Sequence, residues 1–128
     1  MDYVDQLYLK TKWYVSHEIL TLGPDPPAAD EKLSVWENLI LLRADNPEEA
    51  YRKAIEHGYA NESVIRLGRK KGKVRFAGLR DLVLVYDELG DGAEIEWHET
   101  ELTPLEADAL VRGKNDLHAF NPVSRKEK

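Results

Sequence analysis

Cysteine is absent from this sequence of 128 residues. Without thiols the chain has no disulfide, no thiolate nucleophile and no zinc or iron–sulfur site with cysteine ligands. Long apolar runs are also missing, since none approaches the roughly 20 residues that a membrane-spanning helix needs. Met1 is followed by Asp2 rather than by a basic and apolar leader. We therefore expect a cytoplasmic protein with no membrane partner.

Apolar residues nevertheless make up 42% of the chain, which is enough for a packed core. The length favours a single domain over residues 1–128. Within it we expect an N-terminal extension over residues 1–12, a core over residues 13–113 and a tail over residues 114–128. The formal net charge is −6, so the protein is acidic overall.

Alternating apolar and polar residues predict several short strands. The first covers residues 12–22, and the second covers residues 33–44, where the apolar stretch Leu39 to Leu42 suggests a central strand. These two strands should form a hairpin with a proline-rich loop. Four more candidates follow as antiparallel neighbours: residues 64–67, 73–76, 82–86 and 93–99.

Two helices carry clear start signals. Asn46-Pro47-Glu48-Glu49 offers a cap, a first-turn proline and first-turn acids, and predicts a helix from Pro47 to His57. Thr103-Pro104-Leu105-Glu106 is a capping box that predicts a second helix to Arg112. The expected fold is α+β, with an antiparallel twisted sheet of five or six strands and both helices packed mainly on one face.

Several segments together resemble a family of domains of unknown function, DUF4288. The resemblance depends on their order: Trp13-Tyr14-Val15, Trp36-Glu37-Asn38, Asp45-Asn46-Pro47-Glu48-Glu49-Ala50, the stretch from Gly72 to Leu82 and the turn from Asp87 to Glu94. It covers about residues 13–100. It implies a compact α+β domain from an uncharacterised bacterial family and brings no known activity or site.

Charge is sorted into two consecutive blocks. Seven basic residues and no acid lie between Arg66 and Arg80, and seven acids without Lys or Arg lie between Asp87 and Glu101. Pairing of a basic with an acidic strand in one sheet, or between subunits of a homodimer, would explain this sorting. A surface for a protein partner is the second interpretation. Nucleic-acid binding by the basic hairpin is the weakest, because the block has only one aromatic residue, Phe76.

Residues Glu94, Glu96 and His98 would share one face of a strand and could bind a divalent metal. No fourth ligand is evident, so we expect no metal and no other cofactor. His17 is expected to be a buried, hydrogen-bonded histidine, and His57 a helix C-terminal cap. There is no phosphate-binding loop and no recognisable catalytic motif.

The sequence therefore favours a non-enzymatic protein-interaction or accessory module whose partner is another protein or a second copy. The expected interaction surface comprises Arg66, Arg69, Lys70, Lys71, Lys73, Arg75, Glu94, Glu96 and His98. Two alternatives stay open. One is a small-ligand-binding domain with a cleft lined by Trp13, Tyr14, Trp36 and Trp97. The other is an enzyme that uses Glu94, Glu96 and His98.

Overall fold

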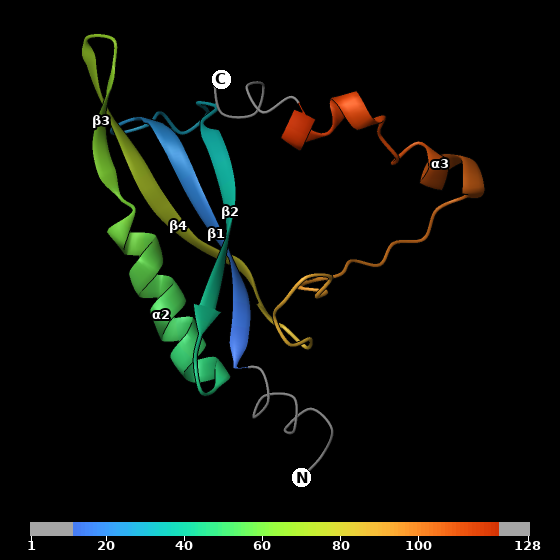
Figure 1. Ribbon diagram of the computed structural model, residues 1–128. Helices are drawn as coiled ribbons and strands as arrows, with labels where there is room; N and C mark the ends of the chain where they lie inside the picture. The colour runs from blue at the N-terminus through green and yellow to red at the C-terminus, as the bar shows by residue number, and fades with distance from the viewer. Residues whose placement is uncertain (1–11, 121–128) are drawn as a thin grey trace. The chain divides into compact units, whose positions relative to one another are not determined.

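The computed structural model describes residues 12–120 (Figure 1). The chain falls into two compact units, residues 1–97 and residues 98–128. Almost all of the expected N-terminal extension lies outside the described residues. The expectation of one domain over the whole chain stays a prediction.

The first unit is built on a curled antiparallel sheet with the strand order β2-β1-β4-β3 (Figure 1). Its strands are β1 (Trp13–Pro24), β2 (Ser34–Arg43), β3 (Ser63–Leu67) and β4 (Lys70–Leu84). The predicted hairpin of the first two strands is confirmed. The prediction of five or six strands is wrong, because the described residues form four.

Two of the predicted strands are parts of the single long strand β4. Its pairing with β1 shifts register twice, between His17 and Glu18 and between Ile19 and Leu20. Each shift leaves one β4 residue, Arg80 or Ala77, without a partner on β1. Such bulges bend a strand and restart its alternation, which explains why the sequence pattern indicated two strands.

The bulges also decide which β4 side chains face the core. The β4 residues that share a face with Tyr14, Ser16, Glu18 and Leu20 of β1 are Leu84, Leu82, Leu79 and Phe76. Along β4 these residues are two, three and three positions apart. In a regular strand, where every second side chain lies on the same face, Leu79 would lie on the opposite face. The two extra residues therefore keep an apolar row on one side of a curled sheet.

Two further strand predictions fail. Residues 93–99 form neither strand nor helix, so the acidic block does not pair with the basic strand. The stretch from Leu39 to Leu42 belongs to β2, which is an edge strand rather than a central one. Leu42 is buried, but Leu39 and Leu41 are exposed. A continuous apolar run cannot distinguish a strand buried on both faces from one with an open side.

Helix α2 (Pro47–Ala60) covers one face of the sheet and contacts β4, β1 and β2 (Figure 1). Its predicted start is confirmed, since the Asn46 side chain accepts a hydrogen bond from the backbone N–H of Glu49 at 2.8 Å. The helix runs three residues beyond the predicted end at His57. Gly58 lies inside it because the ring of Phe76 packs where a Cβ would stand.

The core between α2 and the sheet has two apolar clusters. Tyr14, Ala44, Ala50 and Leu84 form one, and Leu20, Val74 and Phe76 form the other. The face of β1 that carries Tyr14 and Leu20 is therefore the helix-covered face. Both clusters depend on α2, which is too short to be stable alone.

The second unit contains α3 (Pro104–Asp108) and two short 3-10 helices, Lys114–Asp116 and His118–Phe120. The predicted capping box of α3 is confirmed, with Thr103 and Glu106 each bonded to the other's backbone. The helix ends four residues before the predicted Arg112, and none of its residues is buried. Of the two predicted helices, α2 belongs to the first unit together with the sheet, and α3 belongs to the second.

Gly58→Ala tests the close contact between α2 and β4. A Cβ at position 58 would lie 2.3 Å from a ring carbon of Phe76, so we expect a loss of about 1–3 kcal/mol in the free energy of unfolding despite the better helix propensity of alanine. Urea denaturation measures this change. Gly90→Ala is the matched control, since its Cβ meets nothing within 4 Å and should leave stability unchanged. Equal stability of both variants would contradict this packing.

Candidate functional site

Three consecutive polar residues, Ser16, His17 and Glu18, lie buried in the middle of β1. His17 is 5% exposed and Glu18 is 0% exposed. Because neighbouring side chains of a strand point to opposite faces, His17 and Glu18 need partners on different sides of the sheet. The fold supplies both sets.

His17 lies between two carboxylates on the face opposite α2. Its Nδ1 is 2.7 Å from Oε2 of Glu37 on β2, and its Nε2 is 2.6 Å from Oε1 of Glu96. Glu37 also accepts a hydrogen bond of 3.0 Å from the guanidinium of Arg80, the extra residue in one of the β4 bulges. We call these four residues, His17, Glu37, Arg80 and Glu96, the His17 cluster.

The charges of the cluster favour a protonated imidazole. Burial acts to lower the pKa of His17, but hydrogen bonds to Glu37 and Glu96 and their negative charges outweigh it, so the pKa is raised. The hydrogen bond from His17 lowers the pKa of Glu37 against the effect of burial, and Arg80 lowers it further. A neutral imidazole has one N–H, so only the protonated ring donates to both carboxylates.

Glu18 has its partner on the other face. His57, near the end of α2, places its Nδ1 2.8 Å from Oε2 of Glu18. The hydroxyl of Ser16 donates to the same carboxylate at the longer distance of 3.5 Å. His57 therefore links α2 to the central strand, which differs from the predicted role as a helix cap.

The hydrogen bonds of His17 and Glu18 join β1 to the neighbouring elements, and they leave neither side chain as a reactive group. Both ring nitrogens of His17 contact carboxylates, so neither is open to a substrate or a metal. Ser16 bonds Glu18 and not His57, which is not the nucleophile–base contact of a catalytic triad. Within residues 12–120, no group of three His, Asp or Glu side chains is arranged to hold a metal ion.

The structure separates the predicted acidic site. Because residues 93–99 form no strand, the spacing of Glu94, Glu96 and His98 no longer places them on one face. Glu96 bonds His17, whereas Glu94 and His98 are exposed. The argument for metal binding by these three residues is therefore lost.

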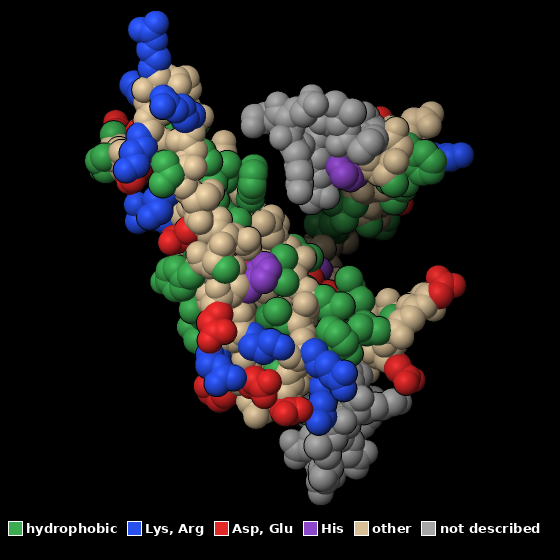
Figure 2. Space-filling model, turned by 60° about the vertical axis from the view of Figure 1, so that its left-hand side comes forward, with side chains coloured by type: hydrophobic (Ala, Val, Ile, Leu, Met, Phe, Trp, Pro, Cys, Tyr) green, Lys and Arg blue, Asp and Glu red, His purple; other side chains and the backbone are tan. Residues whose placement is uncertain are grey.

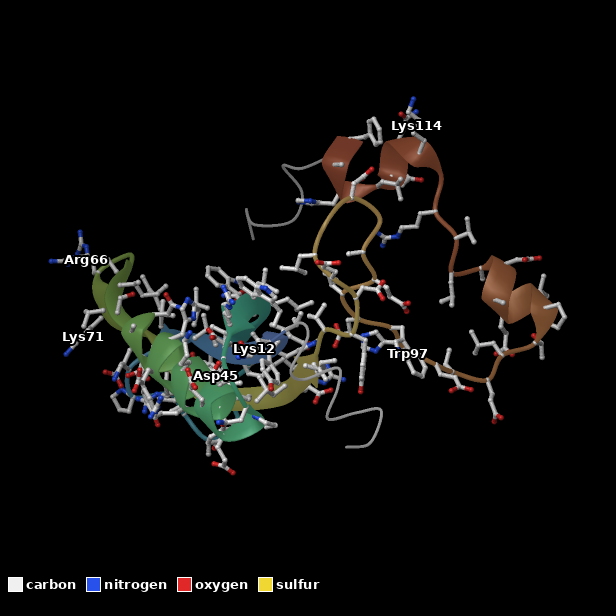
Figure 3. The ribbon with its side chains drawn as sticks, turned by 60° about the horizontal axis from the view of Figure 1, so that its bottom comes forward. Lys12, Asp45, Arg66, Lys71, Trp97 and Lys114 are labelled. Carbon is white, nitrogen blue, oxygen red and sulfur yellow. The ribbon has the colours of Figure 1, made fainter. Side chains whose placement is uncertain are left out.

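The aromatic side chains of the predicted cleft are dispersed. Tyr14 belongs to the core, and Trp13 stacks against Arg43, whose guanidinium carbon is 5.9 Å from the ring centroid. Trp36 and Trp97 are both exposed (Trp97 is labelled in Figure 3). They do not line a common wall of the first unit.

The predicted basic residues stay together at one end of the sheet. Arg66, Arg69, Lys70 and Lys71 are exposed around the tip of the β3–β4 hairpin, where Gly68 takes a positive φ in the turn. Figure 2 shows this end as a concentration of Lys and Arg, and Figure 3 shows Arg66 and Lys71 pointing away from the ribbon. We call these four residues the basic tip.

Further along β4, two of the basic residues have acidic partners. Arg75 lies 3.4 Å from Asp25, and Arg80 bonds Glu37. Among the described residues, no ion pair involves a member of the basic tip. Of the predicted surface, Arg75 is therefore neutralised by an ion pair, whereas the charges of the basic tip are not.

Sequence reasoning found His17 as a buried, hydrogen-bonded histidine, and the structure confirms this. It missed Glu18, Glu37 and the role of His57. The available signal was the polar run from Ser16 to Glu18 inside a strand that is otherwise rich in aromatic and β-branched residues. Its partners are 20 to 79 residues away, and no local pattern identifies them.

The comparison with protein families matches residues 13–97 to the family described as Domain of unknown function (DUF4288). The chain belongs to the DUF4288 family. The match ends where the first compact unit ends, at Trp97, so the family corresponds to the sheet, α2 and the segment that carries Glu96. No curated protein and no solved structure matches the chain. Within the described part of this DUF4288 protein, no helix has the length and apolar character to cross a membrane.

The His17 cluster predicts a pH dependence of stability. The raised pKa of His17 means that its contribution is complete in mild acid and is lost as pH rises through that pKa. The lowered pKa of Glu37 means that its contribution is lost in stronger acid. We expect the free energy of unfolding to be highest between these two pKa values, as measured by urea denaturation across pH.

His17→Gln is the control for this profile. Glutamine keeps one donor and one acceptor but does not titrate, so the decline in stability as pH rises through the raised pKa of His17 should become shallower. A direct measurement is the NMR titration of the His17 imidazole. The same decline in both proteins would contradict the assignment.

The buried Glu18 predicts an asymmetric double-mutant cycle. His57→Ala leaves a buried carboxylate without its imidazole and should reduce the free energy of unfolding by about 1–3 kcal/mol. Adding Glu18→Gln removes the charge, so the double variant should recover part of this loss. Denaturation of the four proteins measures the coupling. Strictly additive effects would show that the two side chains do not interact.

Proposed function

We propose that this DUF4288 domain is a non-enzymatic interaction module that binds an acidic protein surface through its basic tip. The observation that carries the proposal is a pair of like charges. Arg66 and Lys71 are directly opposite each other on β3 and β4, an arrangement that destabilises a sheet. A negatively charged partner would relieve this repulsion.

The tip is also accessible. The pairing of β4 with β1 ends at Gly72, so Lys70 and Lys71 continue with β3 alone, apart from a hydrogen bond from the Asp25 N–H to the Lys71 carbonyl. The two-stranded end extends past the rest of the sheet (Figure 1). Exposed cations on a projecting ribbon favour electrostatically steered association with an anionic surface.

A protein partner fits better than a nucleic acid. Phe76, the only aromatic residue of the basic block, is buried against Gly58 and Tyr59, with ring centroids of Phe76 and Tyr59 5.0 Å apart. It is thus not available for stacking on bases.

Lys71→Glu tests the proposal with a variant that is expected to stay folded, so a loss of binding cannot be due to unfolding. It converts the repulsive pair with Arg66 into an attractive one, so we expect unchanged or higher stability, by at most about 1 kcal/mol. Binding of a fluorescent polyglutamate peptide, measured by anisotropy, should weaken severalfold. The affinity of the wild-type protein for this peptide should fall with added salt.

Lys32→Glu is the matched control, because it makes the same charge change at an exposed loop position outside the tip. Its binding should stay close to that of the wild type. Duplex DNA and single-stranded RNA serve as competing probes. Tighter binding to either than to the peptide would replace the proposal with a nucleic-acid function, and no binding to any probe would contradict it.

A further inference from the structure

The outer edge of β2 is a second surface, separate from the basic tip. The inner side of β2 pairs with β1 along its whole length, from Ser34 opposite Leu22 to Arg43 opposite Trp13. The backbone N–H of Ala44 bonds the carbonyl of Lys12 at 2.9 Å, which fixes the alternation of the ladder. Even-numbered residues of β2 therefore bond β1, and odd-numbered residues direct their N–H and C=O groups outward.

These outward backbone groups are nearly all unused. Among the described residues, the one hydrogen bond to them joins the Lys53 ammonium to the carbonyl of Arg43. Three of these odd-numbered residues carry exposed apolar side chains: Val35 is 59%, Leu39 53% and Leu41 46% exposed. An open ladder thus lies beside a row of exposed apolar side chains.

β2 also lacks the features that usually protect an edge. It contains no proline and no lysine, and its register with β1 is uninterrupted by a bulge. The other edge strand, β3, is protected by its short length of five residues. Natural edges without protection are templates for the addition of another strand.

We propose that β2 pairs with β2 of a second copy, antiparallel, about a two-fold axis at Ile40. In this register Leu39 lies opposite Leu41 of the second copy, and Glu37 lies opposite Arg43 of the second copy. Both pairs occur twice by symmetry. All four positions belong to the outward-facing set, so each pair can exchange two backbone hydrogen bonds.

Charge complementarity selects this register. Moving the axis to Leu39 places Glu37 opposite Leu41 and Arg43 opposite Val35. Moving it to Asn38 places Glu37 opposite Leu39. Either shift sets a charge against an apolar side chain and forfeits both ion pairs, whereas the register at Ile40 matches apolar with apolar and acid with base.

The dimer goes beyond the proposed function and does not depend on it. β2 and β3 are opposite edges of the sheet, so pairing through β2 leaves each basic tip exposed. The resulting sheet has the order β3-β4-β1-β2-β2-β1-β4-β3, with one basic tip at each end. Two tips in one assembly would bind a partner with repeated acidic sites more tightly than one.

Sedimentation velocity over a dilution series of the full chain tests the dimer. We expect the wild type to dimerise, and Leu39→Lys to shift the population to monomer. Arg43→Glu should weaken dimerisation by about tenfold, because two symmetry-related pairs each lose an attraction and gain a repulsion. Circular dichroism checks that each variant is folded.

Two controls locate the interface. Val64→Lys makes a matched change on the exposed part of β3, and Arg52→Glu makes a matched charge change on α2; both should leave the dimer intact. Hydrogen exchange of the Glu37, Leu39 and Leu41 amides should slow as protein concentration rises. A protein that stays monomeric at every concentration, or a dimer lost with Val64→Lys and kept with Leu39→Lys, would overturn the proposal. Polyglutamate binding by Leu39→Lys reports separately on the basic tip.

Discussion

The need to satisfy two adjacent buried polar residues organises the first unit. His17 and Glu18 lie in the middle of the central strand, and their side chains leave it in opposite directions. Glu18 requires His57, which holds α2 on one face. His17 requires Glu37 from the edge strand and Glu96 from a segment without regular structure. Since an unpaired buried charge is strongly unfavourable, these contacts fix the positions of three elements around β1.

The two bulges of β4 contribute to the same packing and charge pairing around β1. A regular strand alongside β1 would turn Leu79 away from the core, and the extra residues Arg80 and Ala77 restore the apolar row. The first of them also supplies a cation to the His17 cluster, where Arg80 bonds Glu37. Curvature, core packing and charge neutralisation therefore have a common origin in two inserted residues.

The surfaces that remain are at the two edges of the sheet. Where β4 runs beside β1, the basic block is partly neutralised, because Arg75 and Arg80 form ion pairs with Asp25 and Glu37. It keeps its charge at the tip, where Arg66 and Lys71 face each other. At the opposite edge, β2 presents apolar side chains and an open ladder. Both features are unfavourable in the isolated chain, and each would be relieved by contact with another molecule.

The sequence by itself determined the elements whose signals are local. The start of α2 at Asn46, the capping box at Thr103, the first hairpin and the basic character of the second hairpin all follow from local patterns. The DUF4288 family follows from the order of several such segments. Only the tertiary structure decided the number of strands, the edge position of β2 and the partners of His17 and Glu18. Alternation within a strand carries no information across a bulge, and hydrogen bonds between residues 20 to 79 positions apart depend on how the whole chain folds.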